Sequence, residues 1–141
     1  MTAINASLAA LFVTIAVAVS GCGDDSPTTP TTLRRSSPVT ERFDSNLVVQ
    51  GSAWRIISAI GTGTLTATLT TVDQPSAVVN FAIGLRNSNG TGCLISQDVV
   101  TAAGTAPQLS AQVDAGDYCV KIADTGTLTT PMKFTITITY P

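Results

Sequence analysis

The side chains that could perform chemistry are few in this chain of 141 residues. It has no histidine, nine acidic residues and seven basic residues. Without an imidazole it can form no Ser-His-Asp or Cys-His arrangement, and it lacks the ligand on which the usual catalytic zinc sites depend. Glu41 is the only glutamate, and most aspartates stand at predicted turns. We therefore expect no pair of carboxylates facing one cleft, as glycoside hydrolysis requires, and no enzyme.

The basic residues are scattered, and no group of them is dense enough to neutralise several phosphates. They are Arg34, Arg35, Arg42, Arg55, Arg86, Lys121 and Lys133. The formal net charge is only −2. We therefore expect no nucleic-acid partner.

Three aspartates flank two predicted turns and are candidate ligands for a calcium ion: Asp114, Asp117 and Asp124. Calcium takes about 6–8 oxygen ligands, and the chain has no dense run of Asp, Asn and Gly like an EF-hand loop. The alternative is that these residues serve the turns, where Asp is common because its side chain bonds nearby backbone groups. No other metal or cofactor is expected.

Trp54 is the only tryptophan and the one candidate ligand-binding side chain. Its indole could stack on a sugar ring. It lies in the apolar run Trp54-Arg55-Ile56-Ile57, which predicts a strand. This position favours a core role over the stacking role.

The N-terminal segment contains an apolar run with the length of an export signal. Leu8 to Val19 is apolar except for Thr14, and no Lys or Arg precedes it. A membrane-spanning helix needs about 20 apolar residues, whereas the apolar part of a signal peptide needs about 7–15. The run ends in Val19-Ser20-Gly21-Cys22, which resembles the lipobox of bacterial lipoproteins. The resemblance implies a helical signal peptide over residues 1–21, cleavage between Gly21 and Cys22, and lipidation of Cys22. The alternatives are an uncleaved N-terminal anchor and a buried helix.

A lipidated Cys22 would hold the protein at a membrane, because two or more acyl chains give stable anchoring whereas one binds only marginally. The resemblance thus implies an extracytoplasmic place in the bacterial cell envelope. Gly23, rather than an Asp, follows Cys22, which favours the outer membrane if the organism has one. Residues 22–40 are rich in Pro, Ser and Thr and predict a flexible tether. Arg34 and Arg35 lie in it, as solvated linker charges or as contacts to lipid phosphates.

The other two cysteines, Cys93 and Cys119, form an even pair once Cys22 is lipidated. In the oxidising envelope such a pair is expected to form a disulfide. Closure of a loop of about 27 residues would stabilise the fold by roughly 3 kcal/mol. Cys119 lies on the face opposite Tyr118 and Val120, so we expect the bridge on the outer side of a sheet. The rival interpretation is a reactive thiol, although no histidine or basic cluster is nearby to lower its pKa.

Residues 41–141 alternate apolar and polar side chains with a period of two, as in strands with one buried and one solvated face. Turn residues, chiefly Gly, Asp, Asn and Pro, separate the runs. The predicted strands are residues 64–70, 79–86, 109–114, 118–123 and 133–140, with 54–57 as a further strand and 46–50 as a weaker one. No long stretch has a helical period. The pattern predicts one all-β domain, an antiparallel β-sandwich of about seven or eight short strands.

Four blocks of this domain resemble, in order, those of the bacterial pre-peptidase C-terminal domain. They are Trp54 to Ile56, Gly63 to Leu69, Ala115 to Ile122, and Phe134 to Ile138. The resemblance spans residues 43–140 and implies a jelly-roll-like sandwich of a kind often found beside secreted peptidases. The chain has Val78-Val79-Asn80-Phe81 where that family often has Asp-x-Asp-Leu, so it implies no calcium or ligand role for those positions.

Together these features predict a non-catalytic, membrane-anchored lipoprotein at the cell surface or in the periplasm. We expect its sandwich to bind or position an envelope or extracellular protein or a polysaccharide. One alternative is a structural envelope component that assembles with neighbouring proteins through its sheet edges. Another is an accessory protein allied to a secreted peptidase.

Overall fold

The computed structural model describes residues 37–141, and all regular elements in that part of the chain are β-strands. The signal peptide expected over residues 1–21 and most of the tether expected over 22–40 lie outside the described residues. The strands are β1 (Val39–Leu47), β2 (Ser52–Ala59), β3 (Gly63–Val72), β4 (Val79–Arg86), β5 (Cys93–Thr101), β6 (Leu109–Val113), β7 (Gly116–Asp124) and β8 (Met132–Tyr140). β1 thus begins ahead of the boundary expected at residue 41. No helix of residues 37–141 is long and apolar enough to cross a membrane.

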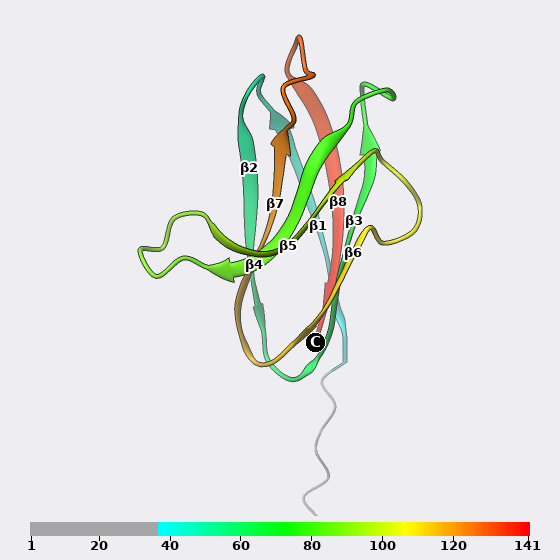
Figure 1. Ribbon diagram of the computed structural model, residues 1–141. Coiled ribbons are helices and arrows are strands. Elements are labelled where there is room, and N and C mark those ends of the chain that lie inside the picture. The colour runs from blue at the N-terminus through cyan, green and yellow to red at the C-terminus, as the bar shows by residue number, and fades with distance from the viewer. Residues whose placement is uncertain (1–36) are drawn as a thin grey trace, which may run out of the picture. The chain divides into compact units, whose positions relative to one another are not determined.

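The strands form two antiparallel sheets that pack face to face (Figure 1). One sheet has the order β1-β8-β3-β6 and the other has the order β2-β7-β4-β5. Every connection except the β4–β5 hairpin passes from one sheet to the other, which gives the strand order of a jelly roll. The prediction of a single antiparallel, jelly-roll-like sandwich is confirmed.

Most connections lie at two opposite ends of the sandwich, and the β4–β5 hairpin projects from its side (Figure 1). At one end, the Ile60 N–H in the β2–β3 turn donates to the Pro141 carbonyl at 3.1 Å. At the other, the Asp73 N–H after β3 donates to the Lys133 carbonyl near the start of β8, also at 3.1 Å. We call these the C-terminal end and the loop end. β1 starts beside the last residues of β8, so the chain enters the sandwich at the C-terminal end.

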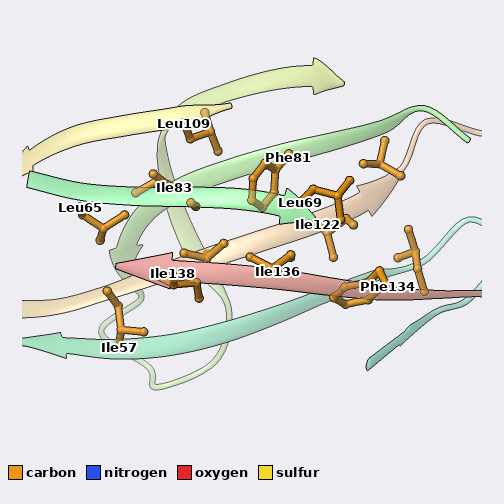
Figure 2. Close-up of a cluster of buried hydrophobic side chains, with 14 of the residues drawn as sticks. Ile57, Leu65, Leu69, Phe81, Ile83, Leu109, Ile122, Phe134, Ile136 and Ile138 are labelled. Carbon is orange, nitrogen blue, oxygen red and sulfur yellow. The ribbon is translucent and has the colours of Figure 1, made fainter. Parts of the chain in front are cut away.

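The core lies between the inner faces of the two sheets (Figure 2). In β8, Phe134, Ile136 and Ile138 are buried at alternate positions, as the period of two predicts. Phe43 of β1 packs edge-on against Phe134, with ring centroids 5.3 Å apart. The inner face therefore follows directly from the alternating pattern.

The weak strand expected at residues 46–50 is wrong. β1 ends at Leu47, and the chain turns back so that the Gly51 N–H donates to the Val48 carbonyl at 2.9 Å. Gln50 in this turn has a φ of 56°, which a strand cannot accommodate. The apolar pair Val48-Val49 suggested a strand, but both side chains are exposed.

β5 is one of two strands that the sequence pattern did not predict, the other being β1. The apolar residues of β5 occur as adjacent pairs, Leu94-Ile95 and Val99-Val100, so the period of two is broken. The register between β4 and β5 shifts at Ile83 and Gly84, which marks a bulge. β5 is also an edge strand, and most of its side chains are exposed. An edge strand with a bulge need not alternate, because only part of one face is buried.

Candidate binding surface

Trp54 lies on the outer face of the β2-β7-β4-β5 sheet, and 45% of it is exposed. Its neighbours in β2, Ala53 and Arg55, point to the other side, where Ala53 packs against the core. The expectation of a core role for Trp54 is therefore wrong. The apolar run around it indicated a strand correctly but gave no means of telling which face was buried.

Arg55 holds β2 in place at the edge of the sandwich. Its guanidinium forms an ion pair with Glu41 of β1, which belongs to the other sheet. The Tyr140 hydroxyl also donates to Glu41, at 3.2 Å, and burial together with this carboxylate raises the pKa of Tyr140. The edge strands of the two sheets are thus joined directly beside Trp54.

Polar side chains continue from Trp54 across the sheet. Trp54 pairs in register with Lys121 of β7, Lys121 pairs with Ala82 of β4, and Ala82 pairs with Asp98 of β5. Paired residues of antiparallel strands point to the same side, so all four share the outer face. The Asn80 amide donates to the Asp98 carboxylate at 2.7 Å. We call Trp54, Lys121, Asn80 and Asp98 the Trp54 face.

The Trp54 face combines an exposed aromatic ring with charged and amide groups that both donate and accept hydrogen bonds. Within residues 37–141, the Lys121 ammonium forms no ion pair, so its three N–H groups are open to a ligand. No imidazole is present to act as a base. The arrangement suits binding by stacking and hydrogen bonding.

The disulfide between Cys93 and Cys119 is confirmed, on the outer side of the same sheet. The two Sγ atoms are bonded, and the Cα atoms are 5.7 Å apart, within the usual range. Cys119 lies opposite Gly84 of β4, and Cys93 lies opposite Arg86 of the same strand. The bond therefore crosses β4 from β7 to the start of β5.

Gly84 makes this crossing sterically possible. A Cβ atom at this position would overlap the carbonyl of Leu94 and approach the Cα of Ile95, both in the β5 backbone. The start of β5 thus lies directly against the outer side of β4. Only a glycine leaves room for that contact.

The three candidate calcium ligands are not brought together. Asp117 and Asp124 lie near opposite ends of β7, a strand of nine residues, at about 3.3 Å per residue. Asp114, before β7, accepts a hydrogen bond from the Thr62 hydroxyl at 3.0 Å. No group of three or more acidic or cysteine residues within residues 37–141 is placed to hold a metal ion.

Asp117 and Asp124 act within the fold. Asp117 accepts bonds from the Ser58 hydroxyl and the Arg86 guanidinium, and these two partners lower its pKa. Asp124 accepts backbone N–H bonds from Gln50, Gly126, Thr127 and Leu128, which lower its pKa. Asp124 thus has the alternative role, that of a turn residue, because its carboxylate joins the β1–β2 turn to the β7–β8 loop.

Tyr118, part of the block that resembles the pre-peptidase C-terminal domain, packs against the core. The backbone N–H of Asp114 donates to its hydroxyl at 3.1 Å. This is the geometry of a tyrosine corner, in which the ring fixes the chain just before the strand. Cys22, Gly21 and the expected cleavage site lie outside the described residues.

Sequence reasoning missed a hollow of about 500 Å³ on the outer face of the other sheet. Asp44, Asp73 and Lys133 line it, together with neutral residues of the same strands. These three residues lie far apart in the sequence and meet only because β8 pairs with both β1 and β3. No local pattern could have grouped them.

Among solved structures, the chain is similar to the Yersinia pseudotuberculosis-derived mitogen. The two are 15% identical, the match covers 74% of this chain and 88% of that one, and the TM-score is 0.53. This likeness shows the sandwich fold alone. No protein-family model matches the chain, and no curated protein matches it.

Proposed function

We propose that this protein is a non-catalytic, lipid-anchored component of the bacterial cell envelope that binds polysaccharide through the Trp54 face. The observation that supports the proposal best is the exposed indole on a sheet face, beside open hydrogen-bonding groups. A large aromatic side chain is normally buried, and an exposed one with polar neighbours is typical of a contact surface.

A saccharide matches the chemistry of this surface. The C–H face of a pyranose ring packs on an indole, and its hydroxyls pair with carboxylate, amide and ammonium groups. Strands lie about 4.8 Å apart, so the row from Trp54 on β2 to Asp98 on β5 spans about 14 Å. A few sugar units could therefore lie across the strands.

Tryptophan fluorescence tests the proposal directly, because Trp54 is the only tryptophan in the chain. The full chain, purified in detergent, would be titrated with soluble polysaccharides such as xylan, alginate, dextran and solubilised peptidoglycan strands. We expect a saturable change in emission with at least one of them. A spectrum that stays constant with every polysaccharide, together with no retention in affinity electrophoresis, would contradict the proposal.

Substitution at position 54 provides the matched test. Trp54→Ala should abolish retention, whereas Trp54→Phe should keep part of it because an aromatic ring remains. Ile60→Ala, at an exposed residue of the β2–β3 turn, is the control and should bind like the wild type. Equal binding by the Trp54→Ala variant would place the contact elsewhere.

The anchor is tested separately by mass spectrometry of the mature protein. We expect the first peptide to begin at Cys22 and to carry acyl chains. A peptide that begins upstream of Cys22 and lacks lipid would overturn the anchor and leave polysaccharide binding untouched.

The open edge of β5 favours a second function, assembly with neighbouring envelope proteins. β5 pairs only with β4, and Leu94 and Val100 are 65% and 61% exposed. A long, exposed apolar edge is a template for pairing with another strand. Crosslinking in cells separates the two functions, because crosslinks from β5 to a protein partner would support assembly.

A further inference from the structure

The hollow on the outer face of the β1-β8-β3-β6 sheet is built from three adjacent strands at the loop end. Register puts Asp44 of β1 beside Thr135 of β8, and Thr135 beside Thr71 of β3. In the next row, Asn46 of β1 lies beside Lys133 of β8.

Asp73 completes this second row on the β3 side. It exchanges two hydrogen bonds with Lys133, from its own N–H to the Lys133 carbonyl at 3.1 Å and from the Lys133 N–H to its Oδ1 at 2.9 Å. The side chains therefore form a grid of two rows across three strands. Paired positions are about 5 Å apart, and the rows are about 6.7 Å apart.

The first row is held by its own contacts. The Arg42 guanidinium donates to the Asp44 carboxylate at 2.7 Å, and the Thr135 hydroxyl donates to it at 2.5 Å. Both contacts lower the pKa of Asp44, that of Arg42 the most. Asp44 is thus a fixed carboxylate at the wall of the hollow.

The second row offers open groups. Within residues 37–141, the Lys133 ammonium forms no ion pair, and no hydrogen bond joins it or the Asn46 amide to another side chain. The Thr71 hydroxyl, at the end of the first row, also has no side-chain partner among these residues. Asp73 uses only its Oδ1 atom and leaves Oδ2 free. Donors and acceptors therefore alternate at about 5 Å around the hollow.

We propose that this hollow binds a short neutral saccharide through pairs of neighbouring hydroxyl groups. The two cations, Arg42 and Lys133, balance the two anions, Asp44 and Asp73, so the hollow attracts neither phosphate nor a metal ion strongly. A sugar hydroxyl can donate to the Asp73 carboxylate and accept from the Lys133 ammonium at the same time. A hollow of about 500 Å³ lies within the range of small-molecule sites.

This site is separate from the Trp54 face, because it lies on the outer side of the other sheet. Its test therefore does not depend on Trp54. The full chain, labelled with ¹⁵N and kept in detergent, would be titrated with cellobiose, maltose, mannose and N,N′-diacetylchitobiose while amide NMR signals are followed. We expect at least one sugar to shift the amide signals of Asn46, Asp73 and Lys133.

Two variants and two controls decide the assignment. Lys133→Met removes the ammonium but keeps an unbranched stem of four heavy atoms. Asp73→Asn keeps an acceptor for the Lys133 N–H but removes the charge. Each should weaken binding about tenfold or more, since hydrogen bonds to charged groups are the strong ones. Thr137→Val, one row outside the hollow, and Ile60→Ala, in the β2–β3 turn at the C-terminal end, should bind like the wild type.

Three results would overturn the proposal. The first is the lack of any amide shift with each of the four sugars at about 10 mM, a concentration high enough to detect weak binding. The second is equal binding by the Lys133→Met and wild-type chains. The third is a set of shifts produced by inorganic phosphate or calcium but by none of the sugars.

Discussion

The outer faces of the two sheets are built in different ways. On the β2-β7-β4-β5 sheet, single residues have tasks that no neighbour shares: Gly84 admits the β5 backbone, and Cys93 and Cys119 join β5 to β7. On the β1-β8-β3-β6 sheet, threonines recur at alternate positions of β3 and β8 and pair with one another in register, as Thr68 does with Thr137. We call this second surface the threonine face.

The two outer faces therefore depend on their residues to different degrees. The threonine face uses a residue type that suits strands and solvent equally, so each position resembles the next. The other face contains a covalent bond and a strand crossing, and each depends on residues that cannot be exchanged. We therefore expect substitutions to have unequal effects on the two faces.

The largest effect is expected for Gly84→Ala. The added methyl group would overlap the β5 backbone, which cannot move away while Cys93 remains bonded to Cys119. Such overpacking should lower the free energy of unfolding by about 3 kcal/mol, measured by urea denaturation. In the control, Gly116→Ala, the Cβ would lie 3.8 Å from the Tyr118 ring, an ordinary contact. Equal losses for the two variants would show that the crossing at Gly84 is not tight.

Removal of the disulfide comes next. The double variant Cys93→Ala, Cys119→Ala should lose about 3 kcal/mol of stability, because the unfolded chain regains the freedom of the closed loop. Reduction of the wild type with dithiothreitol should produce a similar loss, and the double variant should not respond to it. If reduction leaves the wild-type urea midpoint unchanged, the bond contributes nothing to stability.

A second contrast, between the inner and the outer faces of the sheets, separates what the sequence could predict from what it could not. The inner face was predictable because each strand reports its own burial through alternation, as Phe134, Ile136 and Ile138 do. The disulfide was predictable because, with Cys22 set aside, only one pairing remains. The first conclusion needs only the pattern within one strand, and the second needs only the number of cysteines.

The outer faces could not be predicted in this way. Trp54 sits in an apolar run. Its outward orientation follows from the burial of Ile57 and Ala59 on the opposite side of β2, and the ion pair of Arg55 with Glu41 lets Arg55 lie on that side. The hollow around Lys133 depends on register between strands that are far apart in the sequence. The crossing at Gly84 depends on β5, whose broken alternation concealed it.

A smaller effect, specific to acid, is expected for Asp124→Asn. Backbone N–H donors, chiefly that of Gln50, lower the pKa of Asp124 in the folded state below the unfolded value of about 3.9. Its contribution is therefore present above about pH 4 and is lost as the pH falls through the folded-state pKa. The variant should lose stability at neutral pH and depend less on pH below about 4 than the wild type.

The measurement is urea denaturation at a series of pH values from neutral to acid. Asp98→Asn is the control, because Asp98 accepts a hydrogen bond from the Asn80 side-chain amide rather than from backbone N–H groups. Parallel curves of stability against pH for the wild type and Asp124→Asn would contradict the prediction. They would show that the backbone N–H groups stabilise the ionised and the protonated forms of Asp124 equally.

The smallest effect is expected on the threonine face, for Thr137→Val. Thr137 is flanked by Thr68 of β3 and Arg42 of β1, and no hydrogen bond joins its hydroxyl to another group among residues 37–141. Valine has the same branched shape and an equal preference for strands, so the free energy of unfolding should change by no more than about 0.5 kcal/mol. Urea denaturation of this variant and of Gly84→Ala under the same conditions compares the loss of stability on the two faces. A loss of about 2 kcal/mol or more would mean that the threonine hydroxyls act together as a network, and the contrast between the two faces would then fail.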